Sequence, residues 1–116
     1  MAEPRLRQFE KEIGEKLPGE YRKFLLRHNG GCPEPRAFKI HWKNPELAET
    51  YPESYIGSFH ALDGASSNLA ESYRLGRKWF PRSMIPIGED IGGNELLLAL
   101  SGKERGGVFY WVQELA

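Results

Sequence analysis

The chain has 116 residues and is poor in three features: cysteine, net charge and long apolar runs. Its single cysteine, Cys32, excludes a disulfide within the chain and is typical of a reducing compartment. Sixteen basic and sixteen acidic side chains leave a formal net charge of zero, so the overall positive field that attracts nucleic acid or an anionic membrane is missing. The first residues carry no apolar stretch of signal-peptide length, and no segment approaches the ~20 apolar residues of a membrane span. We therefore expect a cytoplasmic protein that binds neither a membrane nor nucleic acid directly.

The sequence also lacks the motifs of common catalytic and metal sites. His28, His41 and His60 have a spacing that matches no zinc-ligand set, and no Gly-x-Ser-x-Gly motif marks a serine nucleophile. The glycine-rich stretch 88–94 lacks the Lys and Ser/Thr of a phosphate-binding loop, so a hairpin turn is the better interpretation. We expect no catalytic residue, no cofactor and no bound metal ion.

The composition is that of one ordinary globular domain. Hydrophobic residues make up 40% of the chain and aromatic residues 12%, which is enough apolar bulk for a core in a chain of this length. We find no internal repeat, low-complexity tract or linker, so we expect a single domain over residues 1–116.

Apolar periodicity predicts two helices near the N-terminus. The first covers residues 4–13, with a proline in its first turn and Gly14 at its end. The second begins at Pro18 and ends at Asn29, Gly30 and Gly31, because asparagine and glycine tolerate the left-handed conformation of a helix C-cap. Its buried side is predicted to consist of Tyr21, Phe24, Leu25 and His28.

The rest of the chain predicts strands and one more helix. Alternation predicts strands at 38–42 and 55–59, separated by a long loop with a possible helical turn at 46–50. Asn68, followed by Glu71 three residues later, predicts a capped helix that carries Trp79 on its buried face and ends at Pro81. Three strands follow at 84–88, 95–100 and 107–113, and the last two are apolar at odd and even positions alike, as in strands covered on both faces. The fold class is therefore α+β, ending in a three-stranded antiparallel meander.

Two blocks of the sequence resemble a known family. The first is Leu-Pro-x-x-Tyr-x-x-Phe-Leu at residues 17–25, followed by Asn-Gly-Gly at 29–31. The second, at residues 85–96, is Ile-Pro-Ile-Gly, an acidic pair, Ile, Gly-Gly-Asn and then Glu-Leu. In this order and separation they resemble the two blocks of the SUKH superfamily, which includes a yeast cell-wall-synthesis regulator and many bacterial immunity proteins. The chain departs from that pattern at 99–100 and 112–113, where members often carry aspartate or Asp-His.

The resemblance implies a fold and a class of function. The expected fold is a single SUKH-like domain with N-terminal helices packed on a mainly antiparallel sheet. The expected function is non-enzymatic: an immunity protein that neutralises a cognate polymorphic toxin, frequently a nuclease, by binding it. The alternative is a regulatory or adaptor domain like the yeast member. The identity of the partner and the oligomeric state stay open.

Two groups of carboxylates are candidates for contact with a basic toxin surface. One surrounds the turn at 88–95 and consists of Glu89, Asp90 and Glu95. The other consists of Glu46, Glu49 and Glu53 in the long loop beside Trp42. We favour the loop group, because a partly exposed Trp42 would add an aromatic anchor and the loop lies outside the two family-like blocks.

Overall fold

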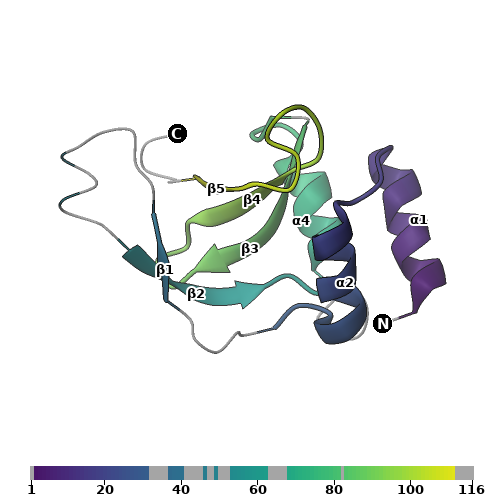
Figure 1. Ribbon diagram of the computed structural model, residues 1–116, viewed down its shortest axis with the longest axis horizontal. Helices are drawn as coiled ribbons and strands as arrows, with labels where there is room; N and C mark the ends of the chain where they lie inside the picture. The colour runs from purple at the N-terminus through teal and green to yellow at the C-terminus, as the bar shows by residue number, and fades with distance from the viewer. Residues whose placement is uncertain are drawn as a thin grey trace.

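The computed structural model describes residues 2–31, 37–40, 46, 49, 53–62, 68–81 and 83–111. Its elements are, in chain order, α1 (Glu3–Ile13), α2 (Gly19–His28), β1 (Ala37–Lys39), β2 (Glu53–Phe59), α4 (Leu69–Gly76), β3 (Met84–Asp90), β4 (Glu95–Ala99) and β5 (Val108–Trp111). The strands form one sheet in the order β1-β2-β3-β4-β5, and every neighbouring pair is antiparallel. The α+β class is confirmed, and the predicted meander is part of a longer one that also contains β1 and β2. Figure 1 shows α1 and α2 at one end of the sheet and β1 at the other.

The two N-terminal helices form where the sequence predicts them. Gly14 ends α1 in the left-handed conformation, with its N–H donating to Glu10 O. Asn29 ends α2 in the same way, with a φ of 50° and its N–H donating to Leu25 O. The prediction for His28 was wrong, since this side chain is exposed, whereas Tyr21 and Leu25 form the buried stripe of α2.

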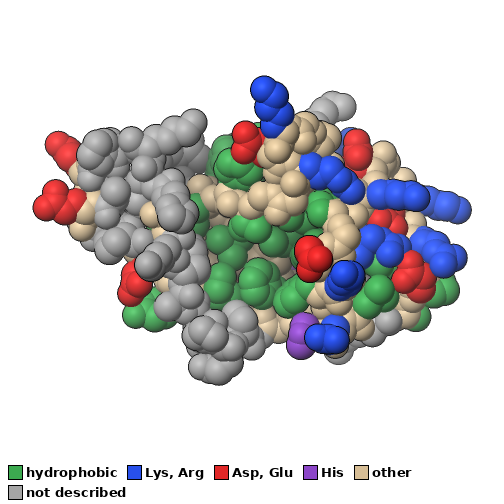
Figure 2. Space-filling model, viewed as in Figure 1, with side chains coloured by type: hydrophobic (Ala, Val, Ile, Leu, Met, Phe, Trp, Pro, Cys, Tyr) green, Lys and Arg blue, Asp and Glu red, His purple; other side chains and the backbone are tan. Residues whose placement is uncertain are grey.

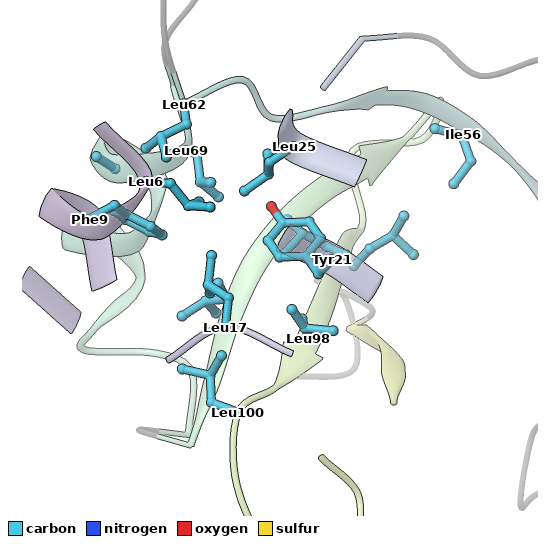
Figure 3. Close-up of a cluster of buried hydrophobic side chains, with 14 residues drawn as sticks. Leu6, Phe9, Leu17, Tyr21, Leu25, Ile56, Leu62, Leu69, Leu98 and Leu100 are labelled. Carbon is cyan, nitrogen blue, oxygen red and sulfur yellow. The ribbon is translucent and has the colours of Figure 1, made fainter. Parts of the chain in front are cut away.

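The main core lies between the N-terminal helices and one face of the sheet. Figure 3 shows Tyr21 of α2 next to Leu98 of β4, and Leu25 of α2 next to Leu6 of α1, all in one core cluster. Ile85, Ile87, Leu96 and Leu98 belong to the same cluster. Because strand side chains alternate between faces, the intervening residues of β3 and β4 point to the opposite side.

Helix α4 contributes Leu69 and Ala70 to the core cluster and also reaches the opposite face of the sheet. Met84 and Pro86 of β3 line a small hollow together with Tyr73 and Gly76 of α4 and with Phe80. Leu97 and Ala99 of β4 are buried as well. The prediction of a strand covered on both faces is therefore confirmed for β4. It was wrong for the described part of the last strand, because β5 is at the edge of the sheet and Val108 is 57% exposed.

The end of α4 differs from the sequence prediction. The helix stops at Gly76, and the N–H groups of Trp79 and Phe80 both donate to Gly76 O. The Phe80 ring folds back over Gly76, where an added Cβ would lie 2.5 Å from a ring carbon. Phe80 thus takes the covered position and Trp79 turns outward, 72% exposed. The prediction that Trp79 belongs to the core was wrong.

The region between α2 and β2 is only partly described. Ala37–Lys39 forms β1 in place of the predicted strand at 38–42, while His41 and Trp42 lie outside the described residues. Glu46 and Glu49 are helical, as expected for a turn of helix there. None of the helices in the described ranges has the length and apolar character needed to cross a bilayer.

Two glycines with positive φ give a test of the fold. Gly30 (φ 86°) packs so closely on the next segment that a Cβ would lie 2.6 Å from His60 O, whereas Gly93 (φ 84°) faces open space. We expect Gly93→Ala to lower the free energy of unfolding by about 1 kcal/mol, through backbone strain alone. Gly30→Ala should cost about 3 kcal/mol, because steric overlap adds to the strain. Urea denaturation of both variants measures the difference, and equal losses would contradict the close approach at Gly30.

Candidate partner-binding surface

The turn between β3 and β4 is organised around the buried carboxylate of Asp90, which is 4% exposed. Its Oδ1 accepts the backbone N–H groups of Gly92 at 2.9 Å and Asn94 at 2.8 Å. Its Oδ2 accepts the hydroxyl of Ser54 at 3.0 Å and the hydroxyl of Tyr110. Asp90 therefore connects β2, the turn and β5, and its charge is used inside the protein.

Hydrogen bonding decides the protonation of this group. Burial alone would raise the pKa of Asp90, but hydrogen bonds from Tyr110, the Asn94 backbone and Ser54 outweigh burial and lower the pKa below its usual 3.8. Burial, and then the hydrogen bond to Asp90, raise the pKa of the Tyr110 hydroxyl. At neutral pH the Asp90 carboxylate is therefore ionised and the Tyr110 hydroxyl is protonated.

The other two carboxylates near the turn lie in different surroundings. Glu89 and Glu95 are direct partners across β3 and β4, so they share one face of the sheet. Glu89 is exposed, whereas the Glu95 side chain is 20% exposed and lies beside His60. The three carboxylates grouped by the sequence therefore do not form one patch, because alternation along β3 separates Asp90 from Glu89.

His60 presents a defined tautomer to Glu95. The amide oxygen of Asn68 accepts the N–H of Ala61 at 2.9 Å, so its amide nitrogen faces His60 Nδ1 at 3.0 Å and donates to it. This places the ring proton on Nε2, which lies 3.7 Å from Glu95 Oε2, beyond hydrogen-bond distance. Both Nε2 and Oε2 are buried, without a hydrogen-bond partner among the described residues. The side chain of Asn68 thus serves His60 and Ala61, in place of the predicted cap on α4.

Beside Glu95 is a hollow that we name the tryptophan groove. It has a volume of about 620 Å³ and is lined by Ser72, Leu75, Gly76, Lys78, Trp79, Phe80, Glu95 and Trp111. Leu75 is 68% exposed, close to the value for Trp79. Trp111 is paired with Glu95 across β4 and β5, and its ring meets Phe80 edge to face at 5.2 Å. The groove thus combines exposed apolar walls with one carboxylate, the composition of a protein contact site.

The second group of carboxylates lies at one end of the molecule. Glu46, Glu49 and Glu53 are all exposed. Glu53 begins β2 and pairs with Lys39 of β1, and β1 lies at the left in Figure 1. In Figure 2, acidic side chains occupy this end, while most of the Lys and Arg side chains gather at the other end over the helices. We name the surface formed by Glu46, Glu49 and Glu53 the acidic end.

Several charged side chains on the helices form ion pairs with one another. Arg22 donates to Glu10 at 3.1 Å and also contacts Glu3. Arg74 forms two hydrogen bonds of 2.7 Å with Glu12. Within the described ranges, no group of three or more His, Cys, Asp or Glu side chains is arranged to hold a metal ion.

Comparison with known proteins places the fold in a family. The model of the SMI1/KNR4 family (SUKH-1) matches residues 2–116. The chain belongs to this family. Domains of the SUKH-1 family are generally non-catalytic and bind partner proteins. No solved structure matches the chain.

A curated relative is the SPbeta prophage-derived uncharacterized protein YokK of Bacillus subtilis (strain 168). It is 26% identical over 121 residues, an alignment that covers 96% of this chain and 62% of the relative. The chain therefore spans less than two thirds of the relative's length.

The SUKH-1 sequence blocks correspond to scaffold in this structure. Leu17, Tyr21 and Leu25 of the first block belong to the core. In the second block, an added Cβ on Gly88 would lie 2.8 Å from Ser58 O, and Asp90 organises the turn. The tryptophan groove lies outside these blocks apart from Glu95, and sequence reasoning missed it. The signal in the sequence that could have revealed the groove was Gly76, because a glycine can end a helix. Here α4 ends at Gly76, three residues before Trp79.

Replacing Asp90 tests its role as a connector. Asp90→Asn keeps the size of the side chain but places an amide N–H₂, a hydrogen-bond donor, against groups that are themselves hydrogen-bond donors. We expect the free energy of unfolding at neutral pH to fall by about 2.5 kcal/mol. The matched control is Glu89→Gln, the same change at the exposed neighbouring position, which should stay within about 0.5 kcal/mol of wild type.

The same pair of variants tests the lowered pKa. A carboxylate with a lower pKa in the folded state contributes stability above its unfolded value of 3.8, and loses it as the pH falls through the lower folded value. The deficit of Asp90→Asn should therefore be full at a pH of about 6 and shrink by a pH of about 2.5. A deficit that stays constant over this range would contradict an ionised Asp90.

Proposed function

We propose that this chain is a cytoplasmic, non-enzymatic immunity protein that neutralises a cognate polymorphic toxin by binding it directly. Membership of the SUKH-1 family supports a binding role. The relative named as prophage-derived supports a role in systems carried on mobile elements. The toxin in this proposal is a nuclease or another protein with a basic active face.

The single observation that carries the proposal is the separation of charge along the molecule. Although the net charge is zero, the three carboxylates of the acidic end are exposed, and Figure 2 shows acidic side chains at one end of the molecule and most basic ones at the other. A nuclease must attract phosphate groups, so the face around its active site is basic. An acidic surface on the inhibitor complements that face and increases the rate of encounter. Binding there would cover the catalytic site of the toxin.

Trp42 precedes Glu46 by four residues in the sequence. In our proposal Trp42 anchors the complex and the glutamates steer it, because buried aromatic side chains contribute most to the lifetime of a complex. Glu89 is exposed and is a further candidate contact. We leave Asp90 out of the surface, since its carboxylate accepts five hydrogen bonds within the domain.

Reversal of charge at the acidic end tests the proposal. The partner used is the protein encoded by the neighbouring gene, immobilised for surface plasmon resonance. We expect Glu46→Lys with Glu49→Lys to lower the association rate about tenfold at low salt, and less at high salt. Trp42→Ala should chiefly raise the dissociation rate. The matched control is Glu15→Lys with Glu20→Lys, the same change in net charge on exposed residues near the helices, which should bind at nearly wild-type rates.

The outcomes separate the two candidate roles. Immunity requires that the neighbouring protein binds this chain and loses its toxic activity in the complex. A regulatory adaptor would bind a protein that is not encoded beside it. Wild-type binding rates for both the Trp42 and the Glu46/Glu49 variants at low salt would place the contact surface elsewhere.

A further inference from the structure

We infer that the tryptophan groove binds an arginine side chain presented by a protein partner. The inference rests on the proposed role in protein binding, but not on the partner being a toxin. It identifies a second contact surface, distinct from the acidic end, with its own chemistry.

The apolar walls of the groove are held in place. Phe80 covers Gly76 at the end of α4, which turns Trp79 outward. The ring of Phe80 also packs against Trp111 on the edge strand. Leu75 is apolar and exposed, as Trp79 is. It adds apolar area that loses contact with water when a partner binds. Because the walls are already formed, a partner would not have to order them.

The charge of the groove determines which side chain complements it. Glu95 lines the groove, and its Oε2 lies 3.7 Å from His60 Nε2. His60 Nδ1 is occupied by the side-chain amide of Asn68, and the distance from Nε2 to Glu95 is beyond hydrogen-bond range. Glu89, the partner of Glu95 across the sheet, adds a second carboxylate on the same face. The Glu95 side chain is 20% exposed, so the reachable part of its carboxylate favours a cation that brings its own donors.

Lys78 is the one cation among the residues that line the groove, and it does not satisfy Glu95. Its side chain is exposed and forms no ion pair with Glu95 in the described part of the chain. An ammonium on a flexible stem is strongly hydrated. Lys78 therefore leaves the carboxylate available to a partner.

Arginine fits the groove better than lysine does. A guanidinium is planar, stacks on tryptophan faces and donates charge-assisted hydrogen bonds to a carboxylate oxygen. Trp79, Trp111 and Glu95 line the same hollow, so one side chain can meet aromatic surface and carboxylate at once. Apolar residues on either side of the arginine would cover Leu75 and the rim.

The test uses a small probe and the intact chain. The probe is the peptide Ac-Leu-Arg-Leu-NH₂, titrated while the indole N–H signals of the three tryptophans are followed by ¹H–¹⁵N NMR. We expect the signals of Trp79 and Trp111 to shift with a millimolar dissociation constant, while that of Trp42 stays in place. The peptide with citrulline, which keeps the shape of arginine without its charge, should not bind. The peptide with lysine should bind at least about threefold more weakly.

Variants separate the carboxylate from the aromatic wall. Glu95→Gln should weaken binding of the arginine peptide at least about tenfold, while Glu89→Gln should change it less than about threefold. Trp79→Ala removes a mostly exposed side chain, so this variant should fold even if Glu95→Gln lowers stability. In Trp79→Ala, the peptide should no longer shift the indole signal of Trp111. Equal binding of the citrulline peptide, equal binding of the lysine peptide or unchanged affinity of Glu95→Gln would overturn the inference. The probe is a peptide and not the toxin, so a peptide that does not bind leaves the proposed immunity function standing. In the same way, a neighbouring protein that does not bind leaves the peptide result standing.

Discussion

The buried carboxylate of Asp90 is the interaction on which the sheet depends. It closes the turn through two backbone N–H groups and reaches Ser54 on β2 and Tyr110 on β5. An ionised group in this position needs all of its partners, since a buried charge left unpaired costs several kcal/mol. The positions of β2, β4 and β5 relative to β3 are therefore set together.

This constraint also positions the tryptophan groove. Since Tyr110 points to Asp90 on one face of the sheet, the next residue, Trp111, points to the other. There it pairs with Glu95 and meets Phe80, which the end of α4 supplies. The same connection that stabilises the hairpin thus brings an aromatic ring and a carboxylate together on the face opposite the main core. In our account, the scaffold blocks of the family and the tryptophan groove are linked through one pair of adjacent residues, Tyr110 and Trp111.

Local chemistry made much of the fold predictable from the sequence. The left-handed caps at Gly14 and Asn29 and the positive φ of Gly93 follow from residue type, and the structure has them. The order of helices and strands followed from periodicity. The failures were questions of tertiary placement. Periodicity put Trp79 on a helix face, but α4 ends at Gly76 and Phe80 takes the covered position. Closeness in the sequence grouped Asp90 with Glu89 around the turn, although the pleat of β3 puts them on opposite faces. The edge position of β5 depends on strand order, which periodicity does not contain.

The central claim is that partners bind at the acidic end and at the tryptophan groove, and not on the N-terminal helices. Hydrogen–deuterium exchange, compared for the free chain and for its complex with the protein encoded by the neighbouring gene, tests this claim most directly. The account predicts slower exchange in the complex for peptides covering residues 46–53, 75–80 and 108–111, with no change over residues 19–28. Slower exchange confined to residues 3–28 would contradict it.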